Sequence, residues 1–350
     1  MKNLKLLNPV ILFSFLSFYF SQCSVKNIED QMPFSLVEKD FQAINLPAVK
    51  DAGLEIAKAP KPTVLQSESA KKMILNIESA SDPSQLTLET KAKINVANFL
   101  TAIASPLVRQ QMQMDIDRMN EATLGLVFFG KETLDPKMSD VVKTIMSSNQ
   151  YKELFAKVLH PEIVVISRVV NVTAPNNIVY KTSPSKGNCG KAAQDALDRA
   201  IRRLQESRET QMNSIESNLK LRIAEANERF SIRNIEAEQN YQFRLKNSAE
   251  EVSKILKAAQ RMSGIDPRLS EELRLLAMTM ALANQLVFKE EYDAALQANI
   301  LARDNEIKLA NLHKQELESE INSNFNREYN NAIATLERVL DACHNQGGGN

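Results

Sequence analysis

The sequence predicts a mainly α-helical protein whose second half is one long antiparallel hairpin of two helices. Between Gly190 and Gly347 the chain contains a single glycine, Gly264, and the last proline of the chain is Pro267. The two residue types that interrupt helices most strongly therefore fall together in residues 263–267. The long stretches on either side of this turn are free to be helical.

The residues of the turn suit the end of one helix and the start of another. Gly264 is expected to adopt the left-handed conformation that closes many helices. Asp266 is expected to cap the next helix through its carboxylate, and Pro267 suits a first helical turn. We therefore expect paired antiparallel helices over residues 190–344.

A long apolar stripe predicts that the first of these helices is continuous. Apolar residues recur in steps of four, three and four from residue 197 to residue 259, and 15 of the 18 stripe positions are apolar, which favours one uninterrupted face. The apolar positions are Leu197, Ile201, Leu204, Met212, Ile215, Leu219, Ile223, Ala226, Phe230, Ala237, Tyr241, Leu245, Val252, Leu256 and Ala259. This eleven-residue period, about 3.67 residues per turn, indicates a coiled-coil-like but nearly straight helix pair.

Two cysteines predict the register of the pair. Cys189 and Cys343 have residue numbers whose midpoint is 266, so folding the chain at the turn brings them together, and we expect a disulfide between them. Facing residues should then have numbers that add to about 532 or 533. This register places Asn234 opposite Asn299, where paired amides can fix the alignment of the helices.

The same register predicts contacts between aromatic, charged and polar side chains. It places Tyr241 opposite Tyr292, Phe230 opposite Arg303, Arg208 opposite Phe325, and Ser248 opposite Gln285. An arginine over an aromatic ring is a favourable contact.

Residues 1–24 have the organisation of a secretory signal. Lys2 and Lys5 supply the positive start, residues 6–20 form the apolar core, and Cys23 ends a small-x-small cleavage site. Cleavage there leaves two cysteines, which suits one disulfide in an oxidising compartment. The alternative is a lipoprotein anchored at Cys23, although Gln22 fits the required motif poorly.

The sequence between the signal and the hairpin predicts three structural segments. Residues 25–64 contain four prolines without a sustained period, so we expect an extended or partly ordered arm. Residues 65–160 are expected to form a small helical domain, and residues 161–189 a β-hairpin followed by a linker. The expected helices of the small domain cover residues 70–78, 86–104, 107–129, 136–148 and 151–159.

The chain also contains one glycosylation sequon and a short glycine-rich C-terminal tail. Asn171 begins the triplet Asn-Val-Thr, which is a glycosylation candidate if the protein passes through a eukaryotic secretory pathway. Residues 345–350 contain three glycines and are expected to form a disordered tail.

The residues that carry catalysis or bind cofactors do not form a recognisable pattern. His160, His313 and His344 are scattered, and no zinc spacing, phosphate-binding glycine loop or nucleophile motif is present in the sequence. We therefore expect no enzymatic activity, cofactor, metal or small-molecule substrate. The 43 basic and 43 acidic residues are interspersed, so the chain lacks the basic stripe that nucleic acid requires.

The segment from residue 273 to residue 288 is apolar almost all round. Leu275, Leu282, Leu286 and Val287 cannot all face the first helix, so they need another covering. We expect a second copy of the chain or the helices of residues 65–160 to supply it. The alternative is insertion into a membrane, as in helical pore-forming proteins, although the apolar run is short for a membrane span.

Together these patterns predict a secreted, non-enzymatic structural or interaction protein. Its disulfide-closed hairpin would serve as a rigid spacer or binding surface, through self-association or a protein partner. The alternative function is that of a secreted, membrane-active protein that inserts its apolar tip.

Overall fold

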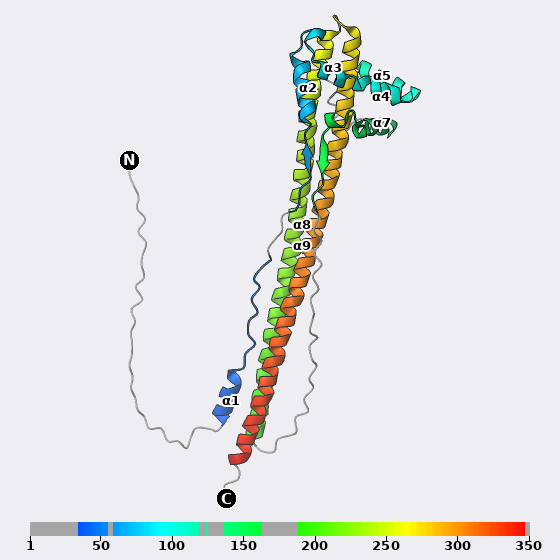
Figure 1. Ribbon diagram of the computed structural model, residues 1–350. Coiled ribbons are helices and arrows are strands. Elements are labelled where there is room, and N and C mark those ends of the chain that lie inside the picture. The colour runs from blue at the N-terminus through cyan, green and yellow to red at the C-terminus, as the bar shows by residue number, and fades with distance from the viewer. Residues whose placement is uncertain (1–33, 55–58, 119–123, 125–135, 163–187, 347–350) are drawn as a thin grey trace, which may run out of the picture. The chain divides into compact units, whose positions relative to one another are not determined.

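The two long helices of the hairpin dominate the fold. The computed structural model describes residues 34–54, 59–118, 124, 136–162 and 188–346. Helix α8 (Asn188–Met262) and helix α9 (Pro267–Gln346) lie side by side (Figure 1). They confirm the predicted helical hairpin. The signal region, the β-hairpin expected after residue 162, and Asn171 lie outside the described residues, as does the tail from residue 347.

The chain divides into two compact units, and both long helices contribute to each. One unit comprises residues 1–46, 177–206 and 325–350, and the other comprises residues 47–176 and 207–324. We call the first the base unit, because it contains the open ends of α8 and α9, and the second the tip unit, because it contains the turn between them.

Facing residues in the tip unit follow the predicted register. The rings of Tyr241 and Tyr292 stack with their centroids 5.2 Å apart. The Arg303 guanidinium carbon lies 4.7 Å from the centroid of the Phe230 ring. Both contacts join residues whose numbers add to 533, so the mirror register inferred from the cysteines is confirmed here.

One predicted contact is corrected by a single residue. The buried Ser248 faces Asn284 rather than Gln285, and the Asn284 side-chain amide donates to the Ser248 hydroxyl at 2.7 Å. Adjacent helical residues point about 100° apart, so only one of the two amides can enter the seam. The numbers of Ser248 and Asn284 add to 532, as do those of the two cysteines, so this contact also lies within the predicted register of 532 or 533.

The backbone conformation of Gly264, in the turn between α8 and α9, differs from the one expected. Gly264 does not adopt the left-handed conformation, which among the described glycines occurs at Gly53 (φ 79°). Instead, the amides of Ile265 and Asp266 donate to the Met262 carbonyl at 3.0 and 2.8 Å. These bonds satisfy the end of α8 through consecutive tight turns, which removes the need for a left-handed residue.

The start of α9 is capped as the sequence predicts. The Asp266 carboxylate accepts a hydrogen bond from the Leu269 amide at 3.0 Å, and Pro267 is the first residue of the helix. The carboxylate satisfies one of the amides left without a partner at a helix start, and its negative charge is favourable there.

Helices from the N-terminal half of the chain cover the apolar segment of α9. Leu275, Leu282 and Val287 are buried, and Leu286 packs against the same core. That core includes Met73 and other residues of α2 (Glu68–Ser79), α3 (Leu88–Ile94), α4 (Val96–Ile103), α5 (Pro106–Arg118) and α7 (Pro136–Ser147). Figure 1 shows α2 and α3 beside the turn. The expected covering by this part of the same chain is confirmed.

Polar contacts hold α2 against the tip of the hairpin. The Arg261 guanidinium donates to the carbonyls of Glu78 at 2.8 Å and Ala80 at 3.4 Å, at the end of α2. The Lys254 ammonium lies 3.0 Å from the Glu78 carboxylate. Arg261 thus satisfies carbonyls at the negative end of the α2 dipole, and both contacts reinforce the apolar packing.

Two expectations for residues 65–160 are corrected by the structure. The single helix expected over residues 86–104 is interrupted at Asn95, whose short polar side chain is a poor helix former, and becomes α3 and α4. The helix expected over residues 151–159 is a single 3-10 turn, η3 (Lys152–Leu154), followed by strand β2 (Lys157–Leu159). Another 3-10 turn, η2 (Pro83–Gln85), precedes α3.

Strand β2 exists because a partner from the expected arm reaches it. Strand β1 (Thr63–Leu65) pairs antiparallel with β2, with Val64 opposite Val158. Both valines pack against the core, while the residues that flank each of them point outward. A segment too short for a stable helix is thus stabilised by pairing and burial as a strand.

The expected arm also contains a short helix, which packs in the base unit. Helix α1 (Phe34–Gln42) ends beside α8, where the Arg203 guanidinium donates to the Phe41 carbonyl at 2.8 Å. Phe41 is almost completely buried, and Arg199 lies 3.5 Å from Glu38. Burial of one aromatic side chain and these polar contacts therefore hold α1 in place.

Candidate functional site

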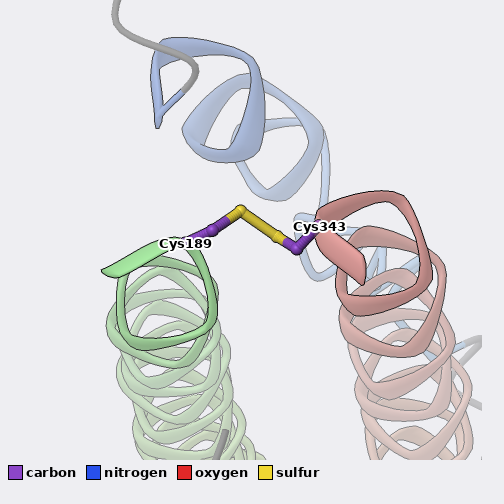
Figure 2. The surroundings of a disulfide bond; sticks show 2 residues. All are labelled: Cys189 and Cys343. Atoms are coloured by element: carbon purple, nitrogen blue, oxygen red, sulfur yellow. A yellow bond between two sulfur atoms is a disulfide. The ribbon is translucent and has the colours of Figure 1, made fainter. Parts of the chain in front are cut away.

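A disulfide joins the two hairpin helices in the base unit. Cys189 of α8 and Cys343 of α9 are bonded, with their α-carbons 6.1 Å apart and 154 positions of sequence between them (Figure 2). Ala193 and Leu197 follow on α8 and are buried, as is Leu336 on α9. The predicted disulfide is confirmed, and it closes a loop that contains the turn and nearly the full length of both long helices.

The predicted pair of seam amides is also present. The Asn299 side-chain amide donates to the Asn234 side-chain carbonyl at 3.0 Å. Asn299 is buried, whereas Asn234 is partly exposed. A half-buried amide pair of this kind disfavours slipped alignments, because slipping would leave both amides without partners.

An extended segment, residues 47–53, lies along α8 in the tip unit, and we call it the strap. The Val49 amide donates to the Gln211 side-chain carbonyl at 3.0 Å, and the Gln211 amide donates back to the Pro47 carbonyl at 3.2 Å. These reciprocal bonds place one glutamine of α8 as a clamp on the backbone of the strap.

Asp51 anchors the strap to both long helices. Its carboxylate accepts hydrogen bonds from Asn218 at 3.0 Å and from the Arg222 guanidinium, and it lies 2.9 Å from the Nε2 atom of His313 on α9. Burial raises the pKa of Asp51, but the hydrogen bonds from Arg222, His313 and other donors outweigh it and hold the pKa well below its usual range. Asp51 is therefore charged at neutral pH.

Two further carboxylates are buried within the seam as ion pairs. Glu306 of α9 binds Arg229 at 2.9 Å and also Arg233, both on α8. Glu291 of α9 binds Arg244 at 2.6 Å. These pairs were not predicted from the sequence, although opposite charges at nearly facing positions in the mirror register could have indicated them. Buried pairs of this kind favour one alignment of the helices more than they add stability.

Two of the histidines lie beside carboxylates. His160 lies 3.0 Å from Glu290, and His313 lies between Asp51 at 2.9 Å and Glu316 at 3.7 Å. Within the described residues, no group of three or more histidine, cysteine, aspartate or glutamate side chains is arranged to hold a metal ion.

Part of the outer face of α8 exposes large apolar side chains. Leu221, Ile232 and Phe243 are 59%, 49% and 62% exposed, and Ile235 is 56% exposed. Leu221, Ile232 and Phe243 follow one another at intervals of eleven residues. They therefore lie in one line along the helix, facing away from the seam. Exposed apolar residues that repeat in a line are typical of a surface that contacts another molecule.

Comparisons with protein-family models, with curated proteins and with solved structures gave no match to this chain. The features of the chain that bear on its function are therefore the disulfide, the seam, the strap and the exposed line on α8.

Proposed function

We propose that the protein is a secreted, non-enzymatic structural or interaction protein that uses its disulfide-closed hairpin as a rigid spacer and binding surface. The observation that carries this proposal is the closure of the hairpin at both ends. A disulfide joins Cys189 to Cys343, and a helical layer packs around the apolar tip. The two helices cannot separate at the base without breaking the disulfide, or at the tip without disrupting the helical layer.

The disulfide supports an extracytoplasmic location. Structural disulfides persist in oxidising compartments and are rare in reducing ones. The signal-like residues 1–24 agree with this location. In the part of the chain that the structure describes, no helix combines the length and apolar character needed to cross a membrane.

The exposed line on α8 supports self-association through the hairpin. Leu221, Ile232 and Phe243 would form a narrow apolar contact, and a second copy offers an identical line with the same spacing. An interface of this kind, in which both copies use the same patch, closes as a twofold dimer.

Light scattering of the chain from residue 25 onward, measured over a wide range of concentrations, tests this proposal. The wild-type mass should rise from one chain to two, whereas Ile232→Glu should remain a monomer because it places a charge in the middle of the contact. Asn227→Glu adds the same charge at an exposed position of α8 outside the line and should still dimerise. A wild-type protein that remains monomeric, or equal dimerisation by Ile232→Glu, would reject this interface.

The alternative of membrane insertion is not favoured, because Leu275, Leu282 and Val287 are already covered by the N-terminal helices. Insertion would have to expose this core, which costs about 25 cal/mol for each Å² of apolar surface uncovered. Dye-loaded liposomes give a direct test. The protein should cause no leakage, and leakage that Leu282→Gln abolishes would support the membrane-active alternative instead.

A further inference from the structure

A strip of exposed side chains runs along the outer face of α8 in the tip unit. Its members follow one another in steps of three or four residues, which keeps them on one side of the helix, away from the seam with α9. We call them the outer strip, and they are Leu221, Ala224, Glu228, Ile232, Ile235, Gln239, Phe243 and Lys246. The outer strip contains the exposed line described above together with the residues beside it.

The apolar side chains of the outer strip match one another when a second α8 runs in the opposite direction. If residues whose numbers add to 467 lie at one level, Ile232 of each copy meets Ile235 of the other. At a neighbouring apolar level, the large ring of Phe243 meets the small Ala224. A large side chain opposite a small one fills the space between two helices without a clash or a gap. This alignment therefore packs both levels.

The polar side chains of the outer strip match in the same alignment. Glu228 meets Gln239, whose side-chain amide can donate to the carboxylate. Leu221 meets Lys246, whose methylene stem can cover the leucine while the ammonium stays in water. Glu228 is the one acidic residue of the outer strip, all of which the structure describes. The antiparallel alignment therefore places no carboxylate of one outer strip opposite a carboxylate of the other.

A parallel pair would place each residue of the outer strip at the level of its own copy. Glu228 would then meet Glu228 of the partner subunit, and like charges that face each other across an interface are unfavourable. Two Phe243 rings would meet at one level and two Ala224 methyl groups at another. The helices would be too close at the first level or too far apart at the second. Charge and size therefore both favour the antiparallel pair.

An open groove of about 400 Å³ lies beside the middle of the outer strip. Ser231, Ile235 and Gln239 of α8 line it, together with Tyr292 of α9 and other residues. In the antiparallel alignment the partner's Ile232 lies at the level of Ile235, so its side chain can enter the groove. Exposed apolar side chains and a hollow thus occur on one face, as a contact of two identical surfaces requires.

We propose that two chains pair through their outer strips with the two α8 helices antiparallel. This geometry rests on the self-association proposed above and adds its orientation and register. The centre of the contact falls between Arg233 and Asn234, where the sum of 467 is halved. At 1.5 Å per residue, the two turns at Gly264 then lie about 90 Å apart. The pair presents its two tips at opposite ends of the contact and serves as a connector with two ends.

Cross-linking of chains with one added thiol tests the orientation. Glu228→Cys and Gln239→Cys place thiols at facing positions, and a short bismaleimide joins free thiols while it leaves the native disulfide intact. The two variants, mixed as dilute monomers and then concentrated, should give a cross-linked dimer. Each variant alone should give little, because its own two thiols would lie about 16 Å apart along the helices. Asn227→Cys is exposed outside the outer strip and is the matched control, which should not cross-link.

A change of side-chain size tests the register. Ala224→Phe places a second large ring opposite Phe243 and should weaken dimerisation about tenfold or more in light scattering. Addition of Phe243→Ala to the same chain exchanges the two sizes and should restore dimerisation. Both positions are exposed, so circular dichroism should show the same helix content in every variant.

Light scattering of the wild-type chain separates this geometry from the self-association on which it depends. A wild-type chain that stays monomeric at all concentrations rejects both. A wild-type dimer in which Glu228→Cys cross-links efficiently to itself, or in which Ala224→Phe dimerises as tightly as the wild type, keeps the self-association and overturns the antiparallel pairing.

Discussion

Removal of the Cys189–Cys343 disulfide should lower the free energy of unfolding of the oxidised chain substantially. The double variant Cys189→Ala and Cys343→Ala removes a bond that spans 154 positions. In the chain-entropy model, a closed loop of 100 residues contributes about 4.7 kcal/mol, and the logarithmic dependence on length raises this to about 5 kcal/mol here. The effect arises mainly in the unfolded chain, which becomes free to explore more conformations.

Denaturant unfolding followed by circular dichroism measures the loss, with reduced wild-type protein as the matched control. The variant and the reduced wild type should show the same lowered midpoint. Hydrogen exchange should also show faster opening of amides around Ala193 and Leu197, next to the missing bond. If the oxidised and variant proteins unfold within about 1 kcal/mol of each other, the reasoning from loop closure is wrong for this chain.

Three other predictions concern the strap, the seam and the turn. Asp51→Asn should destabilise the protein by about 1 to 3 kcal/mol near neutral pH, because it removes a charged acceptor held by Arg222. The folded-state pKa of Asp51 is depressed, so this contribution is fully present above the unfolded pKa of about 3.9 and is lost as the pH falls toward the folded value. Denaturant curves should therefore converge in acid, and a difference that persists there would contradict the pairing. Replacing Asn234 and Asn299 together with Leu should raise the denaturation midpoint while broadening the range of assemblies seen by size-exclusion chromatography, and a less stable variant with one unchanged assembly would rule out a register role. Gly264→Ala should be neutral or stabilising by up to about 1 kcal/mol in thermal melts, because Gly264 does not adopt a positive φ and nothing lies within 4 Å of the added carbon. A marked loss of stability in Gly264→Ala would show that the turn needs a glycine.

The hairpin could be predicted from the sequence because its signals are local or arithmetic. Helix breaking by Gly264 and Pro267, and capping by Asp266, depend on residues next to one another. The eleven-residue stripe is a property of one helix alone. Once the turn was located, the residue numbers of Cys189 and Cys343 were sufficient to align the second helix with the first.

The sequence was less informative about two details of the hairpin. One is which of two adjacent residues enters the seam, and the other is which type of turn satisfies the carbonyls at the end of α8. Asn284, rather than Gln285, binds Ser248, although the predicted register of 532 or 533 allows either residue. Gly264 is compatible with a left-handed residue, but the bonds from Ile265 and Asp266 to Met262 make that conformation unnecessary. The residue types do not distinguish these alternatives, because either amide can bond to Ser248 and either turn can satisfy the carbonyls at the end of α8.

Tertiary structure decided everything that joins the N-terminal half of the chain to the hairpin. Strand β2 forms because β1 pairs with it from almost 100 residues away, and the apolar face around Leu282 is covered because α2 to α7 pack on it. Asp51 carries no motif of its own. Its environment arises when the extended segment at residues 47–53 lies against the two long helices. The sequence by itself determined the turn, the register and the disulfide, because these follow from periodicity and spacing within the hairpin. The anchor at Asp51 depends on contacts between distant segments, which only the folded chain brings together.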